Sequence, residues 1–301
     1  FAASEISDDP FGWNLPNWLL RREMVARLGD LPNVEFCPGT ATSALLTRER
    51  EAIVSLSDGR QIAARLVIGA DGRASTVRQA LNIQVQTIRY GQKALAFATY
   101  HDAPHDNIST EVHRTGGPFT LVPLPDDAAG RHSSAVVWMD RWAEVARLAR
   151  LDIGDFETEM TRRSAGLYGP LRLASRRTVW PIISQIAERF SGERTALLAE
   201  AAHVVPPIGA QGLNMSLADL ACLLDLAKAA PDRLGDREML DSYHRRRWPE
   251  VRARVTGIDL LNRASMLSTP ALRDLRAEAL KTLYAMAPIR RSLMKAGLGM
   301  R

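Results

Sequence analysis

Cysteine is almost absent from this sequence. Cys37 and Cys222 are the only two in 301 residues, and neither has metal-ligand spacing around it. That count excludes a disulfide-stabilised scaffold and is typical of a reducing compartment. No apolar run reaches the roughly eighteen residues that a membrane-spanning helix needs, and no signal-peptide pattern occurs. We therefore expect a cytoplasmic protein, with a peripheral position on the inner membrane face as the alternative.

Other chemistry-bearing patterns are missing as well. The sequence has no P-loop, no Ser-His-Asp constellation and no metal-binding cluster. These absences disfavour kinase and hydrolase functions, and they predict that there is no metal site. The first residue, Phe1, is not a methionine, and the opening residues resemble the middle of a domain. We expect that a segment upstream of Phe1 is missing.

What is present is an ordinary globular composition with a basic balance. Hydrophobic residues make up 46% of the chain and the formal net charge is +5, which is compatible with a large packed core. The positive charge indicates either a solvated surface or attraction to an anionic cofactor, a membrane or nucleic acid. Because the arginine-rich stretches lack interleaved aromatic residues, nucleic acid is not expected as a partner.

The first ninety residues alternate between helical and strand-like patterns. Apolar residues recur at helical spacing over 17–31, and Asn17 is a candidate cap for that helix. The turn 57–60 predicts a hairpin, and the apolar run that ends at Gly69-Ala70 is typical of a buried parallel strand. The strands expected in this part of the chain cover 34–37, 52–56, 61–66 and 66–70.

The remainder divides into a strand-rich part and a helical part. Strands over 94–100, 119–124 and 134–139 predict a mostly antiparallel sheet, a layer expected to cover a substrate. Residues 141–170 have a helical pattern with Arg and Glu on the outer face. Further strands are expected over 178–182 and 194–199, and from Leu213 onward the chain is expected to be almost wholly helical. Trp138 and Trp180 are expected in the core, although Trp138 could line a substrate pocket.

The first motif with chemical meaning runs from Leu66 to Arg78. An apolar strand ends in Gly69-Ala70-Asp71-Gly72, and a helix is expected to begin near Ser75. Ligands of open α/β sheets bind at the carboxyl ends of strands, where a carboxylate can accept from ribose-like hydroxyls and a glycine allows close backbone approach. A plain strand-turn-helix is the equally weighted alternative, since Asp-Gly is a common turn pair.

The second motif runs from Leu197 to Asn214. A strand ends at Glu200, then Pro206-Pro207 and a glycine-rich turn lead into a long helix. The prolines fix the approach, and the helix start around Gly212 to Asn214 offers free N–H groups and a positive dipole end. That suits an anion or a ring that becomes negative on reduction. An ordinary loop is the alternative. His203 is expected to support this loop and not to act as a base.

Together these segments resemble the paired FAD motifs of class A flavin-dependent aromatic monooxygenases. The second resembles the family's Gly-Asp-Ala-Ala-His…Pro-Pro…Gln-Gly-x-Asn stretch, which holds the ribityl chain and the flavin ring. Further segments are similar to the ubiquinone-biosynthesis branch of UbiH, UbiF and VisC type, and these cover 90–94, 117–124, 136–138, 241–247 and 260–263. The resemblance therefore extends over nearly the whole chain.

Two departures from the family pattern matter. Ala199-Glu200 stands where the family has Gly-Asp, and we expect Glu200 still to bind a ribityl hydroxyl. The family also opens with a strand and Gly-x-Gly-x-x-Gly, which seats the FAD pyrophosphate. That motif does not occur here, so the chain alone is expected to bind FAD weakly or not at all. Asn17 stands where relatives place a polar flavin contact.

The resemblance implies a fold, a reaction and a set of site residues. The fold is α/β: an incomplete Rossmann-like FAD-binding domain (1–89 and 176–230), an antiparallel substrate-binding sheet domain (90–175) and a C-terminal helical region (231–301). The reaction uses NAD(P)H and O2 to hydroxylate a phenolic ring, and the flavin performs the chemistry, so no catalytic side chain is assigned. The expected cofactor-binding residues are Asn17, Asp71, Gly72, Glu200, Pro207, Gly209, Gln211, Gly212, Leu213 and Asn214, with Pro206 shaping the ring face.

Two alternatives to a hydroxylase of a polyprenyl-phenol ubiquinone precursor stay open. One is a class A hydroxylase of a soluble aromatic, and the other is a non-catalytic scaffold subunit of a quinone-biosynthesis complex. The basic, amphipathic stretch 245–301 suits a membrane surface or a partner helix, although a helical tail packed on the domain is the simpler interpretation. Its cations are Arg245, Arg246, Arg247, Arg252, Arg254, Arg290, Arg291 and Lys295.

Overall fold

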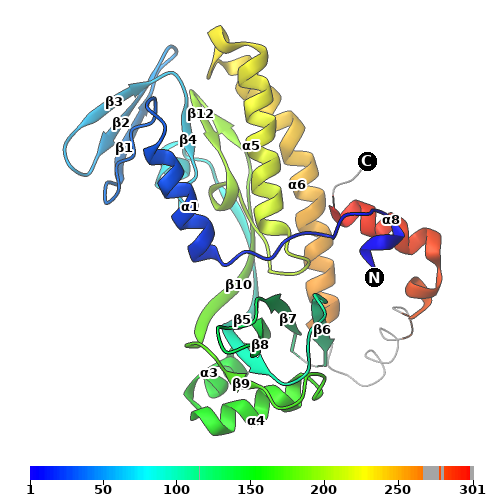
Figure 1. Cartoon of the computed structure of the whole chain (residues 1–301). Coiled ribbons are helices and arrows are strands. Elements are labelled where there is room, and N and C mark those ends of the chain that lie inside the picture. Colours follow the sequence, from blue (N-terminus) through cyan, green and yellow to red (C-terminus); the bar gives the residue numbers. More distant parts are fainter. Residues whose placement is uncertain (115, 267–277, 279–280, 299–301) are drawn as a thin grey trace. The chain divides into compact units, whose positions relative to one another are not determined.

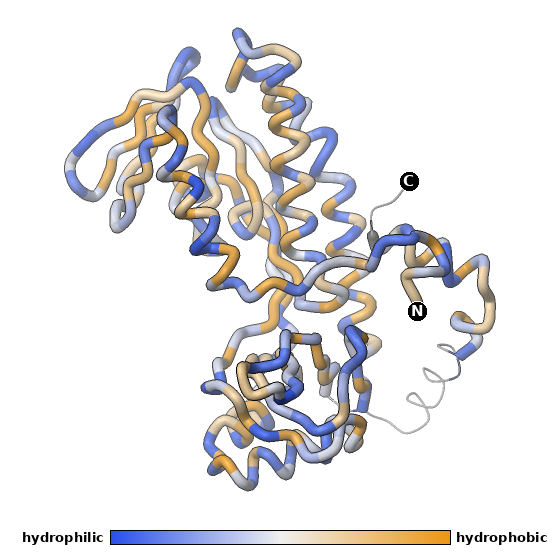
Figure 2. Tube along the Cα trace, in the orientation of Figure 1, coloured by the Kyte–Doolittle hydropathy of each residue, from blue (hydrophilic) through white to orange (hydrophobic). Residues whose placement is uncertain are grey.

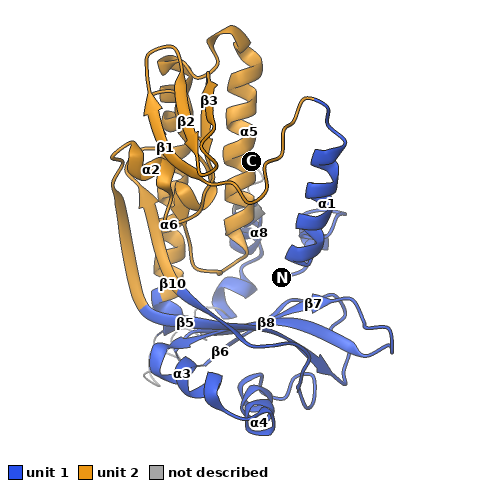
Figure 3. Cartoon of the chain, turned by 90° about the vertical axis from the view of Figure 1, so that its left-hand side faces the viewer, with its two compact units in different colours: residues 1–32, 91–181, 263–301 blue, residues 33–90, 182–262 orange. Residues whose placement is uncertain are grey.

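The computed structural model describes residues 1–114, 116–266, 278 and 281–298. The chain forms two compact units (Figure 3). Unit 1 comprises residues 1–32, 91–181 and 263–301, and unit 2 comprises residues 33–90 and 182–262. The mixed α/β architecture with antiparallel sheets and C-terminal helices agrees with the predicted fold class. The predicted division into functional domains stays a prediction.

Unit 2 contains a small mixed sheet that carries both motifs. Its strands are β4 (Val67–Gly69), β11 (Ser191–Gly192) and β12 (Thr195–Leu197), in the order β11-β12-β4. β4 and β12 are parallel, as expected for the apolar run that ends at Gly69. The expectation that this strand is buried was wrong for Ile68, which is 45% exposed. Successive side chains of a strand point to opposite faces, and only the face of Val67 and Gly69 is covered in this unit.

A three-stranded antiparallel sheet confirms the predicted hairpin. Its strands are β1 (Thr42–Thr47), β2 (Ala52–Leu56) and β3 (Gln61–Ala64). Gly59 has a left-handed φ of 89°, which the tight turn requires. The strand expected over 34–37 was wrong: the segment is irregular, and Val34 and Phe36 are exposed at 39% and 50%. Within the described part of the chain no strand pairs with it, so β propensity alone does not fix its backbone.

The helices of unit 2 pack on a core of aromatic and aliphatic side chains. They are α2 (Thr76–Ala80), α5 (Gln211–Ala229) and α6 (Arg237–Met266, of which 237–262 belong to this unit), together with short 3-10 turns η2 (Ala199–Ala201) and η3 (Pro231–Arg233). Tyr243, Phe190 and Leu197 are fully buried, and the Tyr243 hydroxyl donates to the Leu197 carbonyl at 2.9 Å. The two long helices are drawn in yellow and orange in Figure 1.

Unit 1 is built on an antiparallel sheet, as predicted. Its strands are β5 (Val85–His101, of which 91–101 belong to this unit), β6 (Thr110–His113), β7 (Pro118–Leu124), β8 (His132–Arg141) and β9 (Arg172–Leu173). The order is β5-β8-β7-β6, and β9 pairs with β5. Helices α3 (Trp142–Arg150) and α4 (Ile153–Arg163) occupy the region predicted as helical. They pack on the sheet through Leu148 and Phe156, against Leu95, Phe97 and Trp138.

The structure separates the two tryptophans that were expected in the core. Trp138 is 2% exposed and packs edge-on against Phe119, so its predicted place in the core is confirmed. Trp180, on β10 (Thr178–Ala187), is 51% exposed, so its prediction was wrong. The burial pattern along β10 explains the difference: its first four residues are all exposed, and burial begins only at Ile182. β10 also pairs with β13 (His203–Val204).

The chain ends of unit 1 are helical. They contribute η1 (Ala3–Glu5), α1 (Asn17–Gly29) and α8 (Ala287–Leu298). The predicted cap at Asn17 was wrong: α1 begins at Asn17 itself, the cap position is Pro16, and no side chain caps the helix. Helix after residue 213 is confirmed where it is described, and the rest of that prediction falls on 267–277, 279–280 and 299–301, outside the described residues. No helix in the described ranges is long and apolar enough to span a bilayer.

Candidate cofactor site

The two motifs meet because their strands are neighbours. In the parallel pair, Leu197 of β12 lies opposite Gly69 of β4, and the Leu198 N–H donates to the Gly69 carbonyl at 2.9 Å. The carboxyl ends of parallel strands lie at the same edge of a sheet, which is where ligands of α/β proteins bind. The segments that follow, at Asp71 and at Glu200, are therefore side by side although more than a hundred residues separate them.

The turn after β4 is held by its own side chains. The Asp71 carboxylate accepts from the Ser75 hydroxyl at 2.5 Å and from the Val77 N–H at 3.1 Å. Ser75 in turn caps α2 by accepting from the Arg78 N–H at 2.9 Å. This is the strand-turn-helix arrangement that the sequence left open. The predicted contact of Asp71 with the cofactor stays a prediction, and Asp71 remains exposed to solvent.

The glycines of this turn serve two different purposes. A Cβ on Gly69 would lie 2.8 Å from the Val77 side chain, so the close contact of strand and helix requires a glycine there. Gly72 has a φ of 84°, which favours glycine, and a Cβ built on it would meet nothing within 4 Å. The space beside Gly72 is therefore open to a ligand, as the prediction for this residue requires.

Arg78 joins the two motifs, and sequence reasoning missed it. Its guanidinium donates to the Ala201 carbonyl and to the Arg73 carbonyl, both at 2.8 Å, and the residue is only 4% exposed. Burial lowers the pKa of Arg78, and the charge of Asp71 opposes that effect. An arginine on a short helix usually lies on the surface, so only the tertiary structure reveals this role.

Glu200 has the opposite character to Asp71. It lies in η2, is exposed, and makes no hydrogen bond or ion pair within the described ranges. Its neighbour Ala199 has a left-handed φ of 53°, which turns the chain sharply after β12. The carboxylate is thus free to accept from hydroxyls of a ligand, although its predicted contact with a ribityl hydroxyl stays a prediction.

The loop between Pro206 and α5 prepares an uncapped helix start. Gly209 and Ala210 are both left-handed, with φ of 66° and 51°, and α5 begins at Gln211. No side chain caps this end, and a Cβ on Gly212 would meet nothing within 4 Å. The predicted helix start near Gly212 is therefore confirmed to within one residue. The first turn of a helix has N–H groups without intrahelical partners and a positive dipole end, which fits an anionic ring edge.

Most of the loop residues predicted to contact the cofactor are accessible. Leu213 is 57% exposed, and the Asn214 side chain donates to the Ala210 carbonyl at 3.4 Å. Pro206 is an exception because it is buried, so it can shape the loop through its backbone and packing but not by direct contact with a ligand. The exposed members of the predicted set are Pro207, Gly209, Gly212, Leu213 and Asn214, and Gln211 is half-buried.

His203 supports the loop from inside the unit, as predicted. It is 3% exposed, and its Nε2 lies 2.7 Å from Oδ2 of Asp219, so the ring donates to the carboxylate. Oδ1 of the same carboxylate accepts from Nε of Arg247 at 2.8 Å. Burial lowers the pKa of Arg247, but the hydrogen bond to Asp219 and the charges of Asp219 and Glu250 outweigh it, so the pKa is raised.

Sequence reasoning also missed Asp219 and Arg247. Asp219 is fully buried and stands alone among apolar residues in the middle of α5, which is the one signal that could have identified it. Arg247 was predicted only as part of the basic stretch 245–301, for which a surface and a packed helical tail both stayed open, and its 5% exposure fits the packed tail at this residue. The contact predicted for Asn17 stays a prediction, since Asn17 belongs to unit 1 and the site described here to unit 2.

Comparison with known proteins agrees with this geometry. Residues 13–257 match the family described as FAD binding domain. Ubiquinone hydroxylase UbiL of Rhodospirillum rubrum is 31% identical over 96% of this chain and 67% of its own length. The 3-demethoxyubiquinol 3-hydroxylase of Escherichia coli is 25% identical over 100% of this chain and 76% of its own length. The chain spans 57% of the mouse mitochondrial ubiquinone biosynthesis monooxygenase, and so corresponds to only part of such proteins.

A solved structure supports the same assignment. The crystal structure of pqsL, a probable FAD-dependent monooxygenase from Pseudomonas aeruginosa, matches with a TM-score of 0.68 and 27% identity. The match covers 82% of this chain and 69% of that chain. The family match, the relatives and the fold agree with one another. The chain belongs to the FAD-binding domain family of flavin-dependent monooxygenases, on the branch of the ubiquinone hydroxylases.

Proposed function

We propose that this chain forms the body of an FAD-dependent monooxygenase that hydroxylates the phenolic ring of a ubiquinone precursor with NAD(P)H and O2. The observation that carries the proposal is the adjacency of the Asp71 turn and the Glu200 loop at one sheet edge. That edge offers acceptor oxygens, left-handed backbone with open space and an uncapped helix start. The names of the relatives supply the substrate class.

The residues at this edge fit the riboflavin half of FAD. The Glu200 carboxylate is free to accept from ribityl hydroxyls. Asp71 holds its own turn and would also accept a hydrogen bond from the cofactor. The first turn of α5, from Gln211 to Asn214, would donate to the ring edge that becomes negative on reduction. When bound, FAD would accept a hydride from NAD(P)H and activate O2. The protein supplies position, charge stabilisation and exclusion of water.

The sheet of unit 1 is proposed to bind the aromatic substrate. Leu95 and Phe97 on β5 pack against α3 and α4. The alternate residues Ala94, Ala96 and Ala98 therefore line the opposite face of the strand. Ala94 is 2% exposed, and Ala96 and Ala98 are half-buried, so this part of the face is small and apolar. Apolar contact with a ring and an apolar tail would help to orient the phenol there.

A peripheral membrane contact is the finer part of the proposal. Fewer of the predicted cations are available at the surface than the sequence suggests, because Arg247 is buried and Arg290 pairs with Glu5 at 2.6 Å. Five of the predicted cations stay exposed: Arg245, Arg246 and Arg252 in unit 2, and Arg291 and Lys295 in unit 1. Exposed Leu260 and Leu261 lie on α6, and a lipid-anchored substrate gives such a surface a reason. Co-sedimentation of the full-length protein with anionic liposomes tests this, and absence of binding contradicts it.

The absorbance spectrum of the purified full-length protein is the first test of the function. We expect flavin bands, followed by NAD(P)H oxidation that a phenolic ubiquinone precursor stimulates. A full-length protein without flavin would overturn the proposal. Stimulation only by small water-soluble aromatics would assign the alternative substrate class, and bound flavin without any NAD(P)H oxidation would favour a scaffold subunit.

A further inference from the structure

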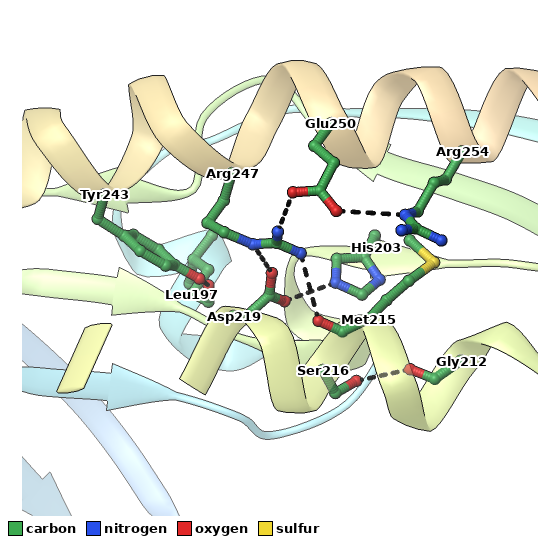
Figure 4. A network of polar contacts seen from close by, with 10 residues as sticks. All are labelled: Leu197, His203, Gly212, Met215, Ser216, Asp219, Tyr243, Arg247, Glu250 and Arg254. Carbon is green, nitrogen blue, oxygen red and sulfur yellow. Dashed lines mark hydrogen bonds and ion pairs between the residues drawn. The ribbon is translucent and has the colours of Figure 1, made fainter. Parts of the chain in front are cut away.

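One continuous chain of polar contacts encloses the loop 203–211. It starts at His203 where the loop begins, and it passes through Asp219, Arg247 and Glu250 to Arg254 (Figure 4). Nη1 of Arg254 then donates to Oε1 of Gln211 at 3.1 Å, where the loop ends. Both ends of the loop that the proposed function assigns to the flavin ring are thus tied to the same series of alternating charges.

Two helices carry this chain of contacts. Asp219 lies on α5, and the other three charged members lie on one face of α6 at spacings of three and four residues. Glu250 is the bridge: one carboxylate oxygen pairs with Arg247 and the other accepts from Nε of Arg254 at 3.3 Å. The side chains of Asp219 and Arg247 are 0% and 6% exposed, whereas those of Glu250 and Arg254 are 43% and 27% exposed. The end next to Gln211 is therefore the part that can be changed without disrupting the core.

The contact with Arg254 fixes which way the Gln211 amide faces. A guanidinium only donates, so it must meet the amide oxygen and not the amide nitrogen. With Oε1 held in this way, Nε2 points to the Gly209 carbonyl and donates to it at 2.9 Å. Arg254 thereby acts through Gln211 on Gly209, the first of the two left-handed residues that precede α5. This contact helps to hold the backbone turn that presents the uncapped helix start.

We propose that Arg254 is a positioning residue of the flavin site, which acts through Gln211 on the Gly209–Ala210 turn. The inference rests on the proposed function, because it assigns the ring to the start of α5. A cation at the amino end of a helix also adds to the positive potential there. Arg254 therefore favours both the geometry of the first turn and the negative charge that the ring acquires on reduction.

The test compares Arg254→Met, Arg254→Lys and Arg252→Met in the full-length protein. Arg252 is the matched control because it lies one half-turn away on α6, is exposed, and stacks over Trp248 with its Cζ 4.9 Å from the ring centre. We expect Arg254→Met to weaken FAD binding about tenfold, since a hydrogen bond from a charged donor is lost. We also expect a lower reduction potential of the bound flavin. Arg254→Lys should restore the potential in part, and Arg252→Met should change neither.

A second variant guards against loss of folding in Arg254→Met. Gln211→Glu retains an acceptor for Arg254 but removes the donor to the Gly209 carbonyl, so it should keep its thermal stability and still bind FAD less tightly. If Arg254→Met and Gln211→Glu both bind FAD with the wild-type affinity and potential, the inference is wrong while the proposed function stands. If the full-length wild-type protein binds no FAD, the proposed function fails and the inference fails with it.

Discussion

The turn after β4 and the loop after β12 lie at neighbouring strand ends, yet they are held in different ways. Asp71, Ser75 and Val77 hold the first through contacts that span four to six residues. The second depends on His203, Asp219 and Arg247, whose contacts span 16 and 28 residues. A turn with local contacts can form early and alone, whereas the loop requires α5 and α6 to be docked. Cofactor affinity should therefore depend most on residues far from the cofactor.

The largest effect is expected from Asp219→Asn. The change leaves Arg247 buried without its main partner, and loss of one member of a buried pair costs about 3 to 5 kcal/mol of unfolding free energy. Chemical denaturation of the purified protein measures it. Asp225→Asn, at an exposed position on the same helix, should stay within about 0.5 kcal/mol of wild type. Equal effects of the two variants would contradict the long-range anchoring of the loop.

Arg78→Met tests the single side chain that connects the two regions. The buried carbonyl of Ala201 and the half-buried carbonyl of Arg73 lose their donor, so we expect the free energy of unfolding to fall by about 1 to 3 kcal/mol. FAD affinity should fall as well, because the Glu200 loop is no longer held beside the Asp71 turn. Arg89→Met, at an exposed position on β5, is the control. If Arg78→Met has the wild-type free energy of unfolding and the wild-type affinity for FAD, Arg78 does not connect the two regions.

Asp71→Ala tests the turn after β4, which is the region held by local contacts. The two hydrogen bonds at the start of α2 disappear, and loss of such a cap typically costs about 1 kcal/mol. If Asp71 also accepts from the cofactor, FAD affinity falls by more than stability alone explains. A titration of FAD fluorescence at a temperature where both proteins are folded separates the two effects. Unchanged affinity would leave Asp71 with the structural role only.

The smallest effect on stability is expected from Glu200→Ala. The side chain is exposed and has no partner within the described ranges, so the free energy of unfolding should change by less than about 0.5 kcal/mol. FAD affinity should nevertheless drop, and Glu200→Asp should retain part of it. A Glu200→Ala variant with wild-type affinity for FAD would show that the ribityl role is wrong.

The sequence could predict what depends on near neighbours. The hairpin at Gly59, the strand that ends at Gly69 and the helix that follows Ser75 all depend on short-range patterns, and all are present. The loop before α5 was found because proline fixes φ and glycine permits left-handed backbone, wherever they occur. What could not be predicted depends on docking. The arginine run gave no indication that Arg247 is buried, and among the described residues no strand pairs with the β-prone segment 34–37.

The amide of Gln211 shows why the site needs a tertiary structure to be understood. Its sequence neighbours suggested only a helix start that could touch a ligand. Its partner Arg254 lies 43 residues further on, on another helix. Hydrophobic burial brings α5 and α6 together, because both helices contribute apolar residues to the core of unit 2. Figure 2 shows apolar segments on α5 and on the strands of unit 2. Polar contacts then select one geometry among the many that burial alone would allow.

The three consecutive arginines 245–247 should differ in how well they tolerate substitution. Arg245 and Arg246 are exposed, whereas Arg247 is buried. Successive residues of a helix point about 100° apart, so a run of like residues on α6 distributes over separate environments. In a library of random variants, most replacements should survive at Arg245 and Arg246 and almost none at Arg247. The fraction of functional variants at each position would therefore distinguish residues that are identical in the sequence.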